Sequence, residues 1–211
     1  MTHLLGLTGS IGMGKSTTAQ MFREEGIPVW DADAVVHALY AKGGAAVAPI
    51  QAVLPDAVVD QAVNRDILKE MIAEDLSVMG KLEEIVHPLV AQDRADFLAN
   101  HTDALIVFDI PLLFETSAQS WLSSVLVVTA PADVQKARVL ARPGMTVDQF
   151  DRILARQMPD ADKRAAADHI IETLTLDDTR TAVQPCWHHQ RCCSERVRVL
   201  AGLWFHGRPA I

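Results

Sequence analysis

Long apolar runs are missing from this sequence of 211 residues. None approaches the roughly 20 residues that a bilayer-spanning helix requires. The N-terminus leads directly into a short apolar segment, without the basic stretch and hydrophobic region of a signal peptide. These absences argue against a membrane-spanning class and predict a cytoplasmic protein.

An excess of basic residues is missing too, because 27 acidic residues against 19 lysines and arginines give a formal net charge of −8. A general nucleic-acid binder usually carries a basic face. We therefore expect no nucleic acid as partner. If the substrates are polyanions, the positive field that attracts them has to be local.

Cysteine is confined to the last 26 residues, at positions 186, 192 and 193. The spacing C-x5-C-C fits none of the usual zinc patterns, and adjacent cysteines are awkward as two tetrahedral ligands. The tail that contains them, residues 184–211, carries four arginines against one glutamate, unlike the acidic chain before it. This shift predicts a segment outside the core and disfavours a metal site.

One glycine-rich stretch, Gly9–Ser16, reads GSIGMGKS and matches the phosphate-binding loop G-x-x-x-x-G-K-[ST]. Glycines let the backbone curl so that successive N–H groups point inward. Lys15 would reach the β- and γ-phosphates of a nucleotide, and the Ser16 hydroxyl would ligate Mg²⁺. An apolar strand over residues 4–8 and a helix over residues 16–25 would supply the context that the motif requires.

Carboxylates follow the apolar segments that predict further strands, which are residues 27–30, 104–109, 124–129 and 168–171. Asp31 and Asp33 follow the first segment, and Asp109 ends the second. Ligands of open α/β sheets bind beyond the carboxyl ends of the strands, so these carboxylates could face phosphates and their metal. The alternative is that Asp33 only caps the next helix.

Two helical regions interrupt this pattern. Residues 43–99 carry helical apolar faces and predict an insert, with breaks near Pro49, Pro55 and Gly80 and an interruption at His87-Pro88.

The second helical region, residues 138–164, carries arginines on two short helices followed by a polar turn at residues 160–164. Arginines on short helices of a phosphate-binding protein predict a mobile lid. The alternative is a solvated surface with i,i+4 ion pairs, for example Asp148–Arg152.

These motifs together resemble the dephospho-CoA kinase family. The resemblance covers residues 4–180 and rests on Gly6–Ser16, Asp31-Ala32-Asp33 with His37, His87–Val90, Asp109–Glu115, the Arg138/Arg142/Gln157 lid pattern and Asp178-Thr179-Arg180. It implies a single α/β domain of the three-layer P-loop kinase fold, with a five-stranded parallel sheet. Its parts would be a core (about 1–42, 100–137 and 165–183), a helical substrate-binding insert (43–99), a lid (138–164) and an atypical tail (184–211).

The resemblance also implies transfer of the γ-phosphoryl group of ATP to the ribose 3′-hydroxyl of dephospho-CoA, the last step of coenzyme A biosynthesis. The implied catalytic residues are Asp33, Lys15, Arg138 and Arg142. ATP would be bound by Gly12, Met13, Gly14, Lys15, Ser16 and Thr17. The acceptor would be bound by Asp33, His87, Leu112 and Glu115. Mg²⁺ would be held by Ser16, Asp31 and Asp109, in part through water.

The sequence departs from the family at three places. Pro143 stands where an acidic or amide residue usually follows the lid arginine, Glu172-Thr173 stands where an asparagine is usual, and the tail replaces a final amphipathic helix. Two other functions stay open: a different small-molecule kinase, such as a nucleoside monophosphate kinase, and a nucleotide-binding protein without a phosphoryl acceptor.

Overall fold

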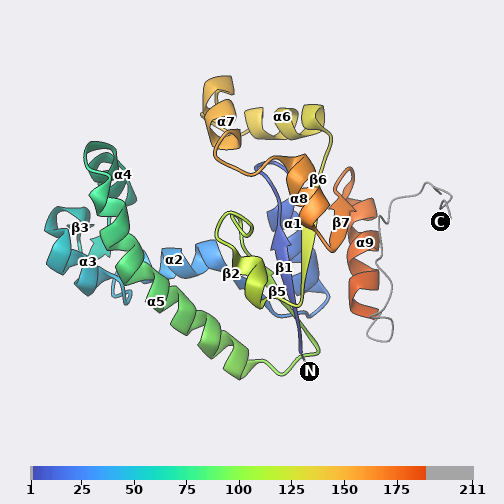
Figure 1. Ribbon diagram of the computed structural model, residues 1–211, viewed down its shortest axis with the longest axis horizontal. Helices are drawn as coiled ribbons and strands as arrows, with labels where there is room; N and C mark the ends of the chain where they lie inside the picture. The colour runs from blue at the N-terminus through green and yellow to red at the C-terminus, as the bar shows by residue number, and fades with distance from the viewer. Residues whose placement is uncertain (1, 189–211) are drawn as a thin grey trace, which may run out of the picture. The chain divides into compact units, whose positions relative to one another are not determined.

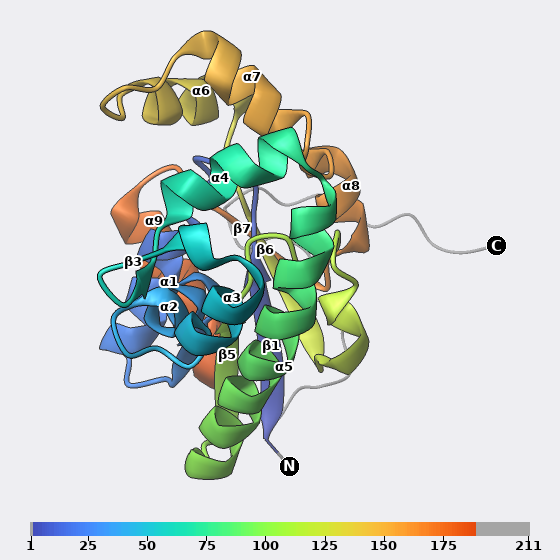
Figure 2. The same cartoon turned by 90° about the vertical axis from the view of Figure 1, so that its left-hand side faces the viewer.

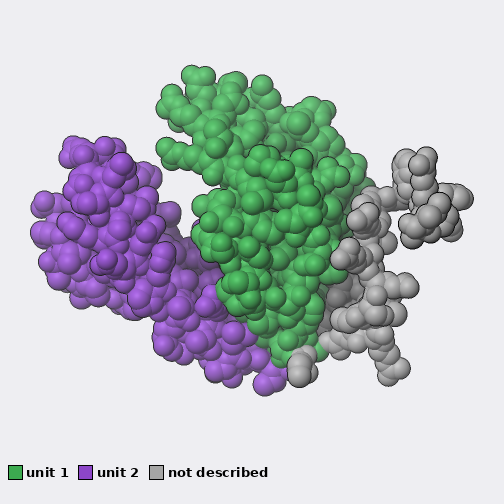
Figure 3. Space-filling model, in the orientation of Figure 1, with its two compact units in different colours: residues 1–29, 103–211 green, residues 30–102 purple. Residues whose placement is uncertain are grey.

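The computed structural model describes residues 2–188, with side chains as far as residue 184. The chain divides into two compact units, coloured separately in Figure 3. Unit 1 comprises residues 1–29 and 103–211, and unit 2 comprises residues 30–102. Residues 189–211, with Cys192 and Cys193, lie outside the described part of the chain.

A five-stranded parallel sheet in the order β2-β5-β1-β6-β7 forms the centre of the fold. Its strands are β1 (His3–Thr8), β2 (Val29–Asp31), β5 (Leu105–Asp109), β6 (Ser124–Thr129) and β7 (His169–Glu172). The central strand β1 pairs on both sides, with Leu5 opposite Val107 of β5 and opposite Ser124 of β6. The α/β class and the five-stranded sheet predicted from the sequence are confirmed.

The helices of unit 1 are α1 (Lys15–Glu24), α6 (Ala132–Leu140), α7 (Val147–Leu154), α8 (Asp160–Ala166) and α9 (Leu176–His188), with a 3₁₀ turn η2 (Ala118–Trp121). Successive residues of β6 enter different cores. Leu126 and Val128 pack with Phe22 of α1 and Val183 of α9, whereas Val127 joins a second cluster around Leu113. Both faces of the sheet are therefore covered, which explains why its strands read as continuous apolar runs.

Unit 2 has its own core. Its elements are α2 (Ala32–Tyr40), α3 (Val47–Val53), η1 (Pro55–Ala57), β3 (Val58–Val59), β4 (Ala62–Val63), α4 (Arg65–Glu74) and α5 (Ser77–Asn100). The apolar cluster around Ile50, Leu68 and Leu82 joins α3, α4 and α5, whose packing Figure 2 shows. The small hairpin β3–β4, which turns through Asp60 and Gln61 with positive φ angles of 51° and 65°, has no counterpart in the sequence-based prediction.

Helix α5 corrects one expectation. The predicted breaks at Gly80 and at His87-Pro88 do not occur, because α5 runs from Ser77 to Asn100 with Pro88 inside it. Buried Val78 and Leu82 before the proline, and half-buried Leu89 after it, belong to the apolar cluster of unit 2 or pack against it. Tertiary packing on both sides of the proline thus holds the helix together despite the missing donor.

Helix α8 corrects a second expectation, since residues 160–164 belong to a helix and not to a polar turn. Pro159 precedes the helix, Asp160 and Asp162 occupy its first turn, and Lys163 and Arg164 lie in its last. This charge order complements the helix dipole. Seven residues with few apolar side chains carry too little periodicity for sequence-based prediction.

Helix α9 continues to His188, five residues beyond the point where the sequence changes character. The helix (Figure 1) packs on α1. Its residues Thr179, Ala182 and Val183 are buried. Within residues 2–188 no helix is long and apolar enough to cross a membrane.

Candidate active site

The stretch Gly9–Ser16 forms the loop that follows β1 and, from Lys15 on, the first residues of α1, as its motif predicts. Gly12 and Gly14 have φ angles of 79° and 87°, a conformation that residues with a Cβ rarely adopt. A Cβ on Gly12 would lie 2.5 Å from Val139 Cγ2, and one on Gly14 would lie 2.8 Å from Thr173 Oγ1. Two separate reasons therefore favour glycine at both positions: the positive φ angle and the close packing against neighbouring side chains.

Lys15, the lysine of the motif, forms an ion pair with Asp109. Its Nζ lies 2.6 Å from Asp109 Oδ1, and the two side chains are 16% and 3% exposed. The sheet creates this pair, because Leu7 of β1 lies in register with Asp109 at the end of β5. The sequence placed Asp109 at the carboxyl end of a strand, and its role as a metal ligand stays a prediction; the sequence did not reveal that Asp109 binds the lysine.

The oxygen-donor set near the loop fits Mg²⁺. Asp109 would offer a carboxylate, and the exposed Ser16 in the first turn of α1 would offer a hydroxyl. Within residues 2–188 no three His, Cys, Asp or Glu side chains gather into a metal site of their own. Mg²⁺ in kinases is commonly held by one or two protein oxygens together with substrate phosphates, so a smaller set suffices.

Thr173, the residue after β7, contacts the backbone of the phosphate loop. Its hydroxyl donates to the Met13 carbonyl oxygen at 2.9 Å, so this threonine supports the loop from within the core. Arg138 of α6 donates through Nη1 to Thr173 Oγ1 at 3.0 Å and through Nη2 to the Thr173 carbonyl oxygen. Thr173 is one of the departures from the family pattern, and sequence reasoning missed its contact with the loop.

The two lid arginines differ in their surroundings. Arg138 is half-buried and bound at the end of β7, whereas Arg142 is exposed beyond the end of α6. Helices α6 and α7 lie side by side in Figures 1 and 2, and α7 begins with a capping box formed by Thr146 and Gln149. The predicted role of both arginines over the transferred group stays a prediction.

Asp31 and Asp33 lie at the start of α2, in unit 2. Asp31 is the N-cap, since its Oδ1 accepts a hydrogen bond from the Ala34 N–H at 3.0 Å. Asp33 lies in the first helical turn and is exposed. The alternative in which Asp33 caps this helix is therefore wrong, because the cap belongs to the residue two positions earlier.

A pocket of about 260 Å³ opens within unit 2. Its lining is Tyr40, Arg65, Leu68, Lys69, Ile72, Met79, Leu82, Glu83, Val86 and His87. Burial raises the pKa of the Tyr40 hydroxyl, and nearby Arg65 partly opposes this effect. The predicted acceptor residue His87 thus lies at an apolar pocket that also carries basic side chains.

The loop after β5 carries the other two predicted acceptor residues. Leu112 is 42% exposed. Glu115 Oε1 accepts hydrogen bonds from Lys163 Nζ and from the Met158 N–H, both at 2.8 Å. Burial acts to raise the pKa of Glu115, but these hydrogen bonds outweigh it and hold that pKa below its usual value.

The sequence model of the dephospho-CoA kinase family matches residues 3–178. A dephospho-CoA kinase of Ruegeria pomeroyi is 58% identical over 184 residues, which cover 87% of this chain and 93% of the relative. One of a Jannaschia species is also 58% identical, over 87% of this chain and 94% of its own length. A crystal structure from Thermus thermophilus superposes with a TM-score of 0.78 at 32% identity, covering 90% of this chain and 99% of that one. The chain belongs to the dephospho-CoA kinase family.

Proposed function

We propose that this protein transfers the γ-phosphoryl group of ATP to the ribose 3′-hydroxyl of dephospho-CoA, completing coenzyme A. The observation that carries the proposal is the phosphate loop, whose lysine is held by a carboxylate at the end of the neighbouring strand. Family membership supplies the acceptor. Phosphoryl transfer needs positioning and charge stabilisation more than covalent chemistry, and the loop provides both.

We assign the donor side to residues of unit 1, together with Asp31 of unit 2. Backbone N–H groups from Gly12 to Thr17 bind the phosphates, and the Lys15 ammonium neutralises charge on the transferred group. Ser16 would hold Mg²⁺, with Asp109 and Asp31 reaching it in part through water. The ion, when bound, offsets negative charge on the phosphate oxygens.

The acceptor side uses Asp33 as the group that orients the ribose hydroxyl and accepts its proton. Arg138 and Arg142 stabilise the charge that spreads over the transferred group. His87 and Leu112 complete the contacts of the acceptor.

The pocket of unit 2 has both apolar and basic side chains, which suits an acceptor with a flexible chain and phosphates. Leu68, Ile72 and Leu82 offer apolar surface to a flexible chain, while Arg65 and Lys69 offer positive charge to a phosphate. Buried apolar surface gives such a site affinity, and the charged groups fix the orientation of the ligand. We therefore assign the non-reacting part of dephospho-CoA to this pocket.

A coupled assay of ADP release with a panel of acceptors tests the proposal. Dephospho-CoA should support turnover, and nucleoside monophosphates should not. Turnover with a nucleoside monophosphate alone would assign the protein to another class of small-molecule kinase. Nucleotide binding without turnover on any acceptor would make it a binding protein.

A further inference from the structure

Ile11 of the phosphate loop is held by two glutamines from segments more than a hundred residues away. Its N–H donates to Gln157 Oε1 at 3.0 Å, and its carbonyl oxygen accepts from Gln135 Nε2 at 2.8 Å. Gln135 belongs to α6, and Gln157 lies in the linker between α7 and α8. Two segments, one before and one after the lid arginines in the sequence, therefore both bind Ile11 of the phosphate loop.

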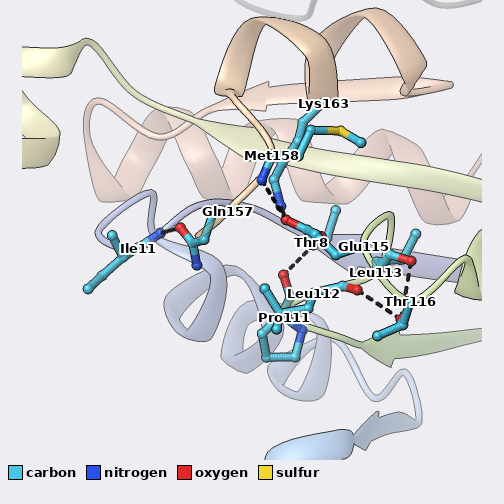
Figure 4. Close-up of polar contacts among 10 residues, drawn as sticks. All are labelled: Thr8, Ile11, Pro111, Leu112, Leu113, Glu115, Thr116, Gln157, Met158 and Lys163. Carbon is cyan, nitrogen blue, oxygen red and sulfur yellow. Dashed lines mark hydrogen bonds and ion pairs between the residues drawn. The ribbon is translucent and has the colours of Figure 1, made fainter. Parts of the chain in front are cut away.

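The linker is fixed immediately beside Gln157. The Met158 N–H donates to Glu115 Oε1, which also accepts from Lys163 of α8 (Figure 4). The Met158 side chain packs on the apolar cluster around Leu113 and Phe114. A hydrogen bond, an ion pair and an apolar contact thus hold the backbone from which the Gln157 side chain extends.

The pair between Lys163 and Glu115 strengthens the attachment of the linker, because the Lys163 side chain is 0% exposed. A buried ammonium is stable only with a charged or strongly polar partner, and removing that partner is costly. The Glu115 loop is in turn tied to the sheet, since Thr8 Oγ1 donates to the Pro111 carbonyl oxygen at 3.0 Å. A continuous series of contacts therefore connects Thr8 at the end of β1 with Ile11 of the phosphate loop. It passes through the loop that contains Pro111 and Glu115 and through the linker that contains Gln157 and Met158 (Figure 4).

We propose that Gln157 is a positioning residue for the phosphoryl donor, anchored by the Glu115–Lys163 pair. It fixes the orientation of the Ile11 peptide. This in turn fixes the backbone conformation in which the next N–H groups of the loop point at the phosphates. Gln157 acts through the loop backbone and touches no reacting atom. The assignment rests on the proposed kinase function, but the binding of ATP tests it without any acceptor.

Isothermal titration with ATP compares Gln157→Met with Gln149→Met. Methionine keeps the length of the side chain and removes the acceptor oxygen. Gln149 is a matched control, because its Oε1 also accepts a backbone N–H, that of Thr146, but at the start of α7. Loss of one hydrogen bond in the loop should raise the Kd for ATP about fivefold to tenfold in Gln157→Met. Gln149→Met should leave that Kd within about twofold.

Steady-state kinetics and thermal melting complete the test. In Gln157→Met the KM for dephospho-CoA and the melting temperature should match those of Gln149→Met. An unchanged Kd for ATP, or a fall in melting temperature that Gln149→Met does not share, would overturn the assignment. If wild-type protein binds ATP but turns over no dephospho-CoA, the proposed function fails and the ATP comparison still decides the role of Gln157.

Glu115→Gln tests whether Glu115 anchors the linker that carries Gln157 or instead contacts the acceptor. An anchor predicts a higher Kd for ATP, by about twofold to fivefold, because Gln157 is held less firmly. The KM for dephospho-CoA should not change. A rise in that KM with an unchanged Kd for ATP would place Glu115 at the acceptor and overturn its role as the anchor of Gln157.

Discussion

Lys15 and Asp109 form an ion pair that is almost withdrawn from water. The carboxylate holds the ammonium at the edge where β1 and β5 end, so the lysine needs little rearrangement to meet a phosphate. Pre-ordering of this kind is a large part of what a kinase site contributes to catalysis.

Asp109→Asn should lower kcat by about a hundredfold, because the lysine loses its charged partner and Mg²⁺ loses a carboxylate. Initial-rate kinetics with saturating dephospho-CoA measure the change. Asp66→Asn is the matched control, since Asp66 pairs with Lys69 at 2.7 Å but both side chains are largely exposed. Wild-type kcat in Asp109→Asn would contradict this role, whereas Asp66→Asn should be neutral.

Asp33→Asn should reduce kcat steeply, by about a hundredfold or more, while the Kd for ATP changes little. An amide keeps the shape of the side chain but cannot accept the proton of the ribose hydroxyl. Single-turnover rates and ATP titration measure the two effects separately. Comparable loss of ATP affinity would instead identify Asp33 as a metal ligand.

Asp31 at the same helix start serves as the comparison, because its carboxylate caps α2. Asp31→Ala should lower the free energy of unfolding by about 1 kcal/mol through loss of the cap. Asparagine at this position caps as well as aspartate does, so Asp31→Asn should leave the free energy of unfolding unchanged. A loss of ATP-dependent activity in Asp31→Asn would then report on its proposed part in holding Mg²⁺.

Helix α5 forms although it contains a locally unfavourable residue, Pro88. Pro88 lies inside α5, where proline removes a backbone donor and crowds the preceding turn. Pro88→Ala should therefore raise the free energy of unfolding by about 1–3 kcal/mol. It should also raise the KM for dephospho-CoA severalfold, because His87, at the pocket, would shift once the proline ring no longer crowds the preceding turn.

Chemical denaturation and steady-state kinetics measure these two effects. Gly80→Ala is the control, since a Cβ at Gly80 meets no atom within 4 Å and alanine favours the same helix. It should stabilise the protein with no change in KM. Equal KM values in Pro88→Ala and wild type would show that the proline does not shape the acceptor pocket.

Glu115 and Lys163 join the β5 loop to α8, and this connection should depend on pH. The lowered pKa of Glu115 means that its stabilising effect is complete above the usual glutamate range. The effect is lost as the pH falls below about 4, because a protonated carboxyl no longer pairs with Lys163. Glu115→Gln resembles that protonated form at every pH.

Wild type should melt about 5–10 °C above Glu115→Gln at pH 7, and the two melting temperatures should converge below about pH 4. Scanning calorimetry across this range measures the difference. Glu24→Gln removes an exposed partner of Arg180 and should show almost no difference at any pH. A gap for Glu115→Gln that persisted at low pH would contradict the assignment of the effect to this carboxylate.

Elements whose sequence carries a strong local pattern were predictable. The runs that became β5 and β6 are continuous and β-branched, and the phosphate loop has a motif in its required context. Helix α8 lacks such a pattern, and what fixes it is the burial of Lys163 against Glu115, 48 residues away. Contacts between distant residues leave no periodic signal in a single sequence.

The same limit applies to the site. Lys15 could be found from its motif, and Asp109 from its place at the end of a strand. The support of Met13 by Thr173, 160 residues later, could not. Such partners are set by which strands become neighbours, and no local pattern encodes that order.

At the scale of the whole molecule, α9 buries Thr179, Ala182 and Val183, and the family match ends at residue 178. Truncation after Val183 should therefore leave kcat and KM close to those of the full chain. Truncation after Leu174 removes α9 and its packing on α1, and should abolish cooperative thermal unfolding. Lost activity in the first variant would show that residues 184–211 contribute to catalysis.

The sheet order has a consequence for how this protein is made on the ribosome. Strand β1 is synthesised first, yet its two neighbours are β5 and β6, which pair with it through residues 105–109 and 124–127. The nascent β1 has no partner strand until more than half of the chain has emerged. Pairings this distant in sequence form slowly, and an unpaired apolar strand is prone to aggregate. The nucleotide site, with β1 and the phosphate loop at its base, is thus translated early and assembled late.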